Sequence, residues 1–418
     1  MVILTEYNIV DYLKDHTNLL EGAQQITSRY FDSGTSESGS GDGYINFVFC
    51  VDYALGGEQK SLVIKQARPY SKLIPIEVPT CRNKTEYEAT RLKRAVVAEY
   101  LPELYLMDQE NNVFVMESLT QWKILRYQFN KMEKQPGLSR KIAEYLAVSN
   151  FFTSEIYLDT SIFRQLECTF VNGDMRRVIE AGIFIPEFTP LGEKGENAEL
   201  NSDLYALSRN IWENHDLIAQ CYLMRDIYMR KSECLIHGDF HTSNIFIRGE
   251  EMKVIDMEYA FVGPYSYDLG YLLNNYISQY AACAFKSPEN LNQAASFQQY
   301  LLESVREIYI AYVEIFDSLW DQFGKETYSH SREYRGAIYR NILQEMLGFA
   351  AAANISRITM LTEFPDFDVI RDRGKHLHAK RLSLIISQQL LLNRTSYEHI
   401  DEVVQDITRI TSIYKSNI

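Results

Sequence analysis

The chain has 418 residues, of which 46% are hydrophobic and 23% are charged. This length exceeds one ordinary domain and the composition can supply a full apolar core, which excludes a disordered chain and predicts two lobes. The formal net charge of −14 argues against nucleic acid or an anionic membrane as the main partner, although a local basic pocket could still bind an anionic ligand.

The cysteines and the N-terminus indicate the compartment. Six cysteines are scattered through the sequence without a C-x-x-C pair. The stretch "MVILTEYNIVDYLKDHTNLL" lacks the basic start and long apolar core of a signal peptide, and no run of about 18 apolar residues occurs. The sequence therefore predicts a soluble cytoplasmic protein with free thiols and no membrane partner.

The first part of the chain is predicted to form strands after a helical start. Residues 1–30 suggest one or two short helices, and residues 31–43 are a Gly/Ser-rich turn region. Residues 44–54 and 61–67 are rich in β-branched and aromatic side chains. The Gly-Gly pair between these two strands predicts an antiparallel hairpin.

Helical patterns follow this hairpin and dominate the rest of the chain. Residues 83–101 have the apolar spacing of a helix, and residues 103–118 suggest two more strands around an Asn-Asn turn. After Leu119 the pattern is mainly helical, with interruptions at 186–199 and 235–261. No internal repeat is apparent.

These elements predict an α+β fold with two lobes. The smaller lobe, residues 1–117, would hold an antiparallel sheet and bind a nucleotide. The larger lobe, residues 118–418, would be mainly helical and would hold the catalytic and substrate-binding residues.

The segment "LIHGDFHTSNIFIRGEEMKVIDMEYAF", residues 235–261, carries the most specific motif. Phosphoryl transfer needs a carboxylate that orients the acceptor hydroxyl, oxygen ligands for Mg²⁺ and a cation on the phosphates. Asp239 is predicted to take the first role, and Asn244 and Asp256 to bind metal. Glu258, two residues further and expected on the same strand face, is predicted to be a further metal ligand. Each acid alone would more often be a loop or capping residue, but the combination predicts a kinase-type site on a protein-kinase-like fold.

Two histidines flank the predicted catalytic acid. His237 and His241 have no third ligand at metal spacing. This favours hydrogen-bonded loop histidines over a zinc site.

The N-terminal region offers groups for the phosphates. Gly39, Gly41 and Gly43 precede a strand, where backbone amides can approach phosphates, although such a stretch is more often only a loop. Lys65, in "LVIKQA", has the pattern of a strand lysine that points inward. No P-loop pattern occurs in the sequence.

Two further expectations concern the same region. The carboxylate partner of Lys65 should lie on the following helix, where Glu86 and Glu88 are both available and Glu86 is favoured. The strand "VFVMESL" ends at Glu117, Ser118 and Leu119, where a linker would offer backbone groups to adenine.

Among such kinases, the sequence resembles the 5-methylthioribose kinase family. The resemblance samples nearly the whole chain, in the family's order and at similar spacing. It rests on six blocks: "GDGYINFVF" (41–49), "VIKQARPY" (63–70), "VMESL" (115–119), "IHGDFHTSNIF" (236–246), "VIDMEYAFVGP" (254–264) and "GFAAAANISRI" (348–358).

The resemblance implies an enzyme that transfers the ATP γ-phosphate to the 1-hydroxyl of 5-methylthioribose in methionine salvage. It implies Mg²⁺ as cofactor and a homodimer. Asp239 and Arg357 are implied to bind the sugar, and Asp256 and Glu258 the metal, beside Asn244, which the motif itself predicts as a metal ligand. The residues expected to bind ATP are Asp42, Gly43, Asn46, Lys65, Glu86, Glu117, Ser118, Leu119, Asp256, Met257 and Glu258.

The sequence departs from the family pattern at a few positions. Ser243 and Asn244 stand where the family reads Gly-Ser, Met257 stands where it reads Pro, and Ser356 replaces the first of two adjacent arginines. Two alternatives to the methylthioribose activity therefore stay open. One is a kinase of another small acceptor, such as 5-deoxyribose, another pentose, an amino alcohol or an aminoglycoside. The other is a non-catalytic nucleotide-binding protein.

Overall fold

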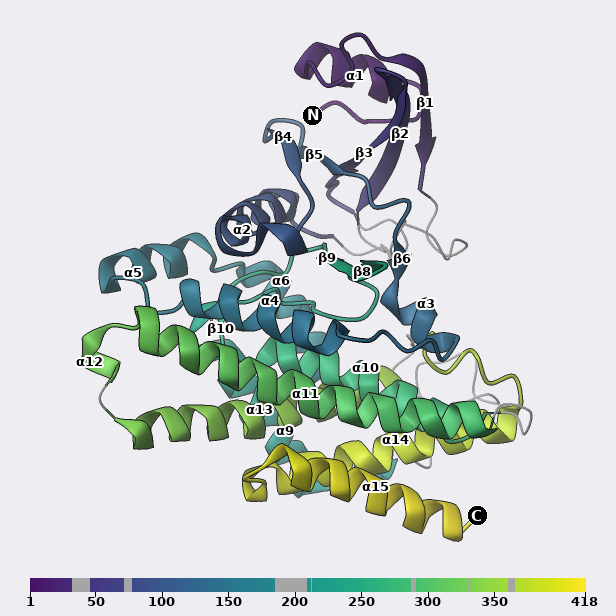
Figure 1. The fold of residues 1–418 in the computed structure, drawn as a ribbon, viewed down its shortest axis with the longest axis vertical. Helices are drawn as coiled ribbons and strands as arrows, with labels where there is room; N and C mark the ends of the chain where they lie inside the picture. Colours follow the sequence, from purple (N-terminus) through teal and green to yellow (C-terminus); the bar gives the residue numbers. More distant parts are fainter. Residues whose placement is uncertain are drawn as a thin grey trace. The chain divides into compact units, whose positions relative to one another are not determined.

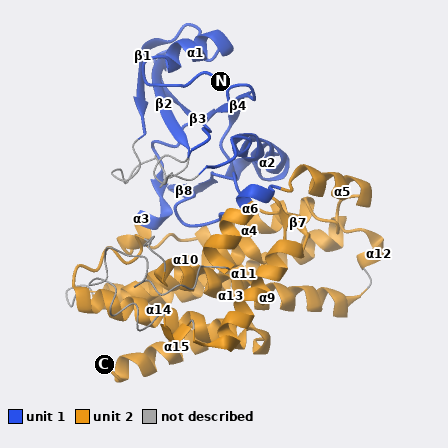
Figure 2. Ribbon diagram, turned by 180° about the vertical axis from the view of Figure 1, so that it is seen from behind, with its two compact units in different colours: residues 1–127, 172–175, 237–260 blue, residues 128–171, 176–236, 261–418 orange. Residues whose placement is uncertain are grey.

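The chain folds into two compact units, coloured separately in Figure 2. The computed structural model describes residues 1–31, 46–70, 77–184, 209–211, 213–286, 291–329, 331–359 and 365–418. The first unit comprises residues 1–127, 172–175 and 237–260, and the second comprises residues 128–171, 176–236 and 261–418.

A five-stranded antiparallel sheet forms the centre of the first unit (Figure 1), with the strand order β1-β2-β3-β5-β4. The strands are β1 (Gln24–Tyr30), β2 (Phe47–Leu55), β3 (Glu58–Gln66), β4 (Leu104–Asp108) and β5 (Val113–Glu117). The helical elements of this unit include α1 (Ile9–His16), α2 (Arg82–Val97) and the 3₁₀ turn η1 (Ala98–Tyr100).

The hairpin between β2 and β3 confirms the predicted Gly-Gly turn. Leu55 pairs with Glu58, and the two residues between them, Gly56 and Gly57, have φ of 64° and 87°. Two successive positive φ values match the right-handed twist of the strands, and glycine adopts them without strain. The sequence therefore sets the register of β3, which carries Lys65.

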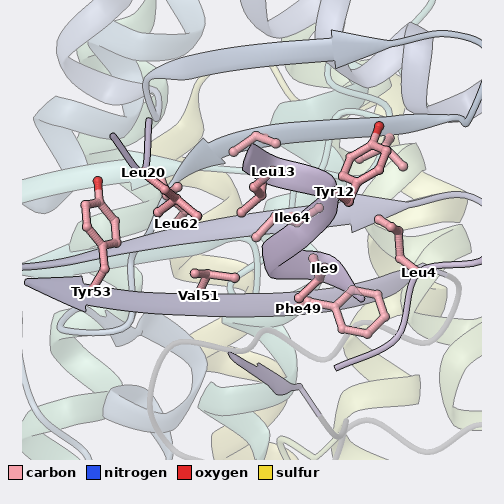
Figure 3. Packing of buried hydrophobic residues seen from close by; sticks show 12 residues of the cluster. Leu4, Ile9, Tyr12, Leu13, Leu20, Phe49, Val51, Tyr53, Leu62 and Ile64 are labelled. Carbon is pink, nitrogen blue, oxygen red and sulfur yellow. The ribbon is translucent and has the colours of Figure 1, made fainter. Parts of the chain in front are cut away.

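One apolar cluster joins α1 to the sheet (Figure 3). Ile9 and Leu13 of α1 are buried in the same cluster as Val51 of β2 and Leu62 and Ile64 of β3. Leu62 and Ile64 are two residues apart, so they share one face of the strand. Lys65 follows Ile64 directly and therefore lies on the opposite face.

The expectation of one or two short helices in residues 1–30 agrees with α1, but the last part of this stretch is a strand that was not predicted. Residues 24–30 form β1, which pairs with β2 from Gln24 opposite Ala54 to Tyr30 opposite Phe49. The segment "QQITSRY" contains β-branched and aromatic residues and alternates between more and less exposed side chains, as an edge strand does.

A small sheet brings the motif segment into the first unit. Its strands have the order β6-β8-β9, with β6 (Lys123–Ile124), β8 (Ile245–Arg248) and β9 (Glu251–Val254). Lys123 pairs with Ile247, which links the residues after β5 to the motif. The first unit thus includes residues well beyond 117. The predicted lobe boundary between residues 117 and 118 stays a prediction.

The second unit is mainly helical. Every residue of α10 (Tyr267–Cys283) is buried, and this helix packs against α11 (Leu291–Phe323), α13 (Arg332–Thr359) and α14 (Arg373–Asn393). α3 (Leu125–Asn130) and α6 (Gly173–Ile179) have residues in both units. The other elements are α4 (Leu138–Phe152), α5 (Thr160–Thr169), η2 (Glu180–Phe184), α9 (His215–Arg230), β7 (Cys234–Leu235), β10 (Val262–Gly263), α10 (Tyr267–Cys283), α11 (Leu291–Phe323), α12 (Glu326–Ser329), α13 (Arg332–Thr359), α14 (Arg373–Asn393), η4 (Arg394–Ser396) and α15 (Ile400–Ser416).

The predicted combination of an antiparallel N-terminal sheet and a mainly helical remainder is confirmed. All six cysteines are free thiols, as expected. Within the described ranges, every helix is too short or too polar to cross a membrane. The predicted interruption at 186–199 and the glycines of 39–43 lie outside the described residues.

Candidate active site

Lys65 of β3 is the centre of a buried ionic cluster in the first unit. Its Nζ donates to Oε1 of Glu86 and to Oδ1 of Asp256, each at 2.7 Å. Only 4% of Lys65 is exposed. Burial lowers the pKa of Lys65, but the charges of Asp256 and Glu86 more than offset this, so the net shift is upward. Lys65 is therefore a fixed cation between two carboxylates.

The partner of Lys65 on α2 is Glu86 rather than Glu88. Glu86 is buried, and burial raises its pKa to about 7 although the charge of Lys65 opposes the rise. Glu88 accepts hydrogen bonds from the guanidinium of Arg91 at 2.9 and 2.7 Å on the surface of the same helix. The predicted pairing of Lys65 with Glu86 is thus present.

A second group of buried polar side chains surrounds Glu258. The Nδ2 of Asn46 donates to Oε2 of Glu258 at 2.8 Å, and the Nε of Arg82 lies 3.3 Å from the same oxygen. Sequence reasoning missed Arg82. The available signal was its position four residues before Glu86, which places both side chains on one face of α2.

The carboxylates in this cluster outnumber the cations. Glu86, Asp256 and Glu258 face two cations, Lys65 and Arg82, so fully charged side chains would carry one negative charge in excess. Burial raises the pKa of Glu258 to about 8, and the charge of Asp256 adds to the rise while Arg82 opposes it. A divalent cation would relieve this excess.

The residue types also fit Mg²⁺, which prefers carboxylate and amide oxygens. In the conformation described, Asp256 is bonded to Lys65, and Glu258 to Arg82 and Asn46. No group of three or more His, Cys, Asp or Glu side chains is arranged around a metal position in the described part of the chain.

The loop after β9 corrects the prediction that Asp256 and Glu258 share a strand face. β9 ends at Val254, and Asp256 has φ of 76°. A left-handed conformation is uncommon for a residue other than glycine and ends the regular alternation of a strand. Asn172 holds the loop, since its Nδ2 donates to the carbonyls of Glu258 and Ala260 at 2.9 and 3.0 Å.

His237 fixes the entrance to the loop that carries Asp239. Its Nε2 lies 2.9 Å from the carbonyl of Ile255, and its Nδ1 accepts from the backbone N–H of Asp239 at 3.2 Å. These bonds require the neutral tautomer with the proton on Nε2. Gly238 has φ of 84°, and a Cβ there would lie 2.2 Å from the carbonyl oxygen of Tyr259. Only glycine fits this position.

Asp239 is held between two side chains of its own loop. Oδ2 of Asp239 lies 3.3 Å from Nε2 of His241, whose Nδ1 accepts from the backbone N–H of Ser243 at 3.2 Å. The Nδ2 of Asn244 donates to the carbonyl of Asp239 at 3.0 Å. Asp239 and Asn244, two of the predicted site residues, are thus directly linked, and His241 is a hydrogen-bonded loop histidine as expected.

The predicted adenine linker follows β5. The carboxylate of Glu117 accepts from Nζ of Lys253, in β9, at 2.7 Å. Ser118 and Leu119 continue the chain, and the carbonyl of Leu119 accepts from the N–H of Trp122 at 2.9 Å. The side chain carboxylate of Glu117 is therefore engaged within the protein, which leaves backbone groups as the predicted contacts.

The remaining predicted residues are Met257, Asp42, Gly43 and Arg357. Met257 is fully buried beside Asp256. Asp42 and Gly43 lie outside the described residues. Arg357, in α13 of the second unit, donates to the hydroxyl of Tyr271, with its guanidinium carbon 5.9 Å from that ring's centroid.

Comparison of the sequence with known proteins indicates the class of protein. A family model described as "Phosphotransferase enzyme family" matches residues 186–300. The matched segment is therefore similar to small-molecule phosphotransferases, which are kinases that use ATP.

The relatives define the family more closely. A methylthioribose kinase of Bacillus cereus (strain B4264) is 31% identical over 390 residues, which cover 93% of this chain and 92% of the relative. One of Bacillus mycoides (strain KBAB4) is 30% identical with the same coverage. The chain belongs to the methylthioribose kinase family, and the predicted α+β, protein-kinase-like fold is confirmed.

Solved structures were also matched. A choline kinase from Cryptosporidium parvum Iowa II is 12% identical, with a TM-score of 0.49 over 94% of this chain and 99% of its own. A glucosamine kinase is 12% identical, with a TM-score of 0.43 over 86% of this chain and 79% of its own.

Proposed function

We propose that this kinase transfers the γ-phosphate of ATP to the 1-hydroxyl of 5-methylthioribose, with Mg²⁺ as cofactor. The observation that carries the choice of acceptor is the identity of 31% to a methylthioribose kinase across 93% of the chain. The bonds from Lys65 to both Glu86 and Asp256 support the transfer chemistry, because that pairing puts a fixed cation beside a predicted metal ligand.

The nucleotide is proposed to bind through the cluster in the first unit. Lys65, oriented by Glu86, would contact the phosphates. Asp256, Glu258 and the amide oxygen of Asn244 would hold Mg²⁺, which would supply positive charge to offset the charge that develops during transfer.

Further ATP contacts are proposed from the sequence. Backbone groups of Glu117, Ser118 and Leu119 would bind adenine, and Asp42, Gly43, Asn46 and Met257 complete the expected set. The amide oxygen of Asn46 accepts from Arg82 and its amide nitrogen donates to Glu258, which supports a contribution through the loop that carries the proposed metal ligands.

The acceptor hydroxyl is proposed to react at Asp239. The oxygen of that hydroxyl would form the new bond to the γ-phosphorus, the bond from that phosphorus to the bridging oxygen would break, and ADP would leave. The hydroxyl proton would pass to the Asp239 carboxylate, which His241 keeps oriented through its 3.3 Å contact.

The identity of the acceptor is the most specific part of the proposed function. Arg357 would donate to two sugar oxygens through its guanidinium fork. The alternatives are 5-deoxyribose, another pentose, an amino alcohol or an aminoglycoside as acceptor, or nucleotide binding without catalysis. The joint presence of Lys65, Asp239, Asn244 and Asp256 argues against the last, because a degenerate site commonly loses at least one such residue. A homodimer stays a prediction from family resemblance.

An ADP-release screen tests the proposal. Purified protein with Mg-ATP is given 5-methylthioribose, 5-deoxyribose, ribose, choline or kanamycin. We expect the highest kcat/KM with 5-methylthioribose. A higher value with another acceptor would reassign the substrate, and no release with any acceptor, together with measurable ATP binding, would favour a non-catalytic protein.

A further inference from the structure

Arg82 is a buried arginine whose function no sequence motif indicates. It is 0% exposed and lies at the first position of α2. Its Nε donates to Oδ1 of Asn46 at 3.0 Å and lies 3.3 Å from Oε2 of Glu258. Its Nη1 donates to the carbonyls of Arg68 and Pro79 at 3.1 and 2.8 Å. The guanidinium is therefore fixed by several segments of the first unit.

The contact with Glu258 has a consequence for metal binding. Glu258 is buried, and a buried carboxylate is stable only beside a cation or hydrogen-bond donors. Arg82 and Asn46 supply both at the same oxygen, Oε2. Partners of this kind orient a carboxylate that binds metal.

Asn46 completes the arrangement around Glu258. Its Oδ1 accepts from Arg82 and its Nδ2 donates to the same Oε2 atom that Arg82 approaches. A closed triangle of three side chains restricts both the position and the rotation of the Glu258 carboxylate. Arg82 and Glu258 are far apart in sequence, so the triangle exists only in the folded unit.

We propose that Arg82 is a positioning residue which keeps the Glu258 carboxylate oriented for the metal that accompanies ATP, with Asn46 as the bridging amide. This inference rests on the proposed function, because it assigns Arg82 a task within the same Mg-ATP site. Arg82 acts through Glu258 and does not itself contact substrate.

The test measures ATP binding by isothermal titration calorimetry, once with Mg²⁺ and once with EDTA. The informative quantity is the gain in ATP affinity that Mg²⁺ provides. We expect Arg82→Gln to reduce this gain by about tenfold while ATP affinity in EDTA changes by less than about twofold. Arg82→Lys retains a cation beside Glu258 and should restore most of the gain. Arg91→Gln removes an exposed arginine of the same helix and should leave both values unchanged.

A double-mutant comparison separates this role from a general structural one. If Arg82 acts through Glu258, Arg82→Gln should have no further effect on the Mg²⁺ gain once Glu258→Gln is present. Equal effects in both backgrounds would overturn the inference, as would an unchanged gain in Arg82→Gln. If Arg82→Gln fails to fold, Asn46→Leu replaces it in the same comparison. We then expect Asn46→Leu to reduce the Mg²⁺ gain in ATP affinity when Glu258 is present and to have no further effect in the Glu258→Gln background. Equal reductions in both backgrounds would overturn the inference.

The wild-type measurement separates a failure of the proposed metal site from a failure of the role proposed for Arg82. A wild-type protein whose ATP affinity does not depend on Mg²⁺ would contradict the proposed metal site itself. A clear Mg²⁺ gain in the wild type that all Arg82 variants share would contradict only the role of Arg82.

Discussion

Lys65 and Asp256 are 191 residues apart in the sequence, yet Nζ of Lys65 donates to Oδ1 of Asp256 at 2.7 Å. Their contact joins β3 to the loop that follows β9. Asp256 adopts a left-handed backbone at this point, with φ of 76°. The bond therefore joins a cation fixed on a regular strand to a carboxylate on an irregular loop, which is the arrangement on which the proposed nucleotide site depends.

Replacement of Lys65 tests the cation. Lys65→Met should lower kcat/KM for ATP by about 10²-fold, because it removes the proposed phosphate donor and leaves Glu86 and Asp256 buried without their common partner. Lys60→Met is the matched control, since Lys60 lies on the same strand and is exposed. Steady-state kinetics with both variants provide the comparison, and equal losses would show that the site does not depend on Lys65.

Replacement of Asp239 tests the acceptor base. Asp239→Asn keeps the size of the side chain but removes its charge, so kcat should fall by about 10²-fold or more while ATP affinity stays nearly the same. Calorimetric ATP binding serves as the control for folding. Near wild-type turnover in Asp239→Asn would rule out Asp239 as the group that orients the hydroxyl.

Replacement of the carboxylates tests the metal site. Asp256→Ala should lose activity by at least about 10²-fold, and added Mg²⁺ should not restore it, because the ligand itself is missing. Glu258→Ala should have a smaller defect that higher Mg²⁺ partly corrects. Activity is measured across a Mg²⁺ titration and in EDTA. Full activity of the wild type in EDTA would contradict the assignment of both residues.

Replacement of Arg357 tests the acceptor pocket. Arg357→Ala should raise the KM for the sugar at least about tenfold, which corresponds to roughly 1.4 kcal/mol, with little change in the KM for ATP. Tyr271→Phe removes the hydroxyl that accepts from Arg357 and should have a smaller effect in the same direction. Unchanged sugar kinetics in Arg357→Ala would place the acceptor elsewhere.

For the neighbouring Ser356, the structure predicts a different result of substitution than the sequence alone does. An arginine at this position would restore the family's pair, but Ser356 is only 2% exposed and its hydroxyl donates to the carbonyl of Gly182 in η2. Ser356→Arg should therefore reduce the free energy of unfolding by roughly 1–3 kcal/mol through overpacking. Chemical denaturation measures this loss. An unchanged stability, with a preference shifted toward 5-methylthioribose, would show that the family's pair fits here.

The parts that the sequence predicted are those with a local pattern. The Gly56-Gly57 hairpin follows from backbone conformation, and the pairing of Lys65 with Glu86 follows from a strand that precedes a helix. β1 was missed because seven residues of weak alternation resemble the helical start before them.

The contacts that the sequence could not predict depend on long-range packing. Asn46 bonds to Glu258 across 212 residues, and no local pattern around either residue indicates the other. The left-handed conformation of Asp256 could also not be predicted from the sequence, because an aspartate at the end of an apolar run is typical of a strand end. Arg82 could have been noticed only by its spacing from Glu86.

The central claim is the transfer of phosphate from ATP to the 1-hydroxyl of 5-methylthioribose. Its most direct test is ³¹P and ¹³C NMR of the product formed from Mg-ATP, 5-methylthioribose and the purified protein. The account predicts a single phosphorylated sugar in which phosphorus couples to carbon 1, formed together with an equal amount of ADP. A phosphate on another hydroxyl, or ADP released without a phosphorylated sugar, would contradict it.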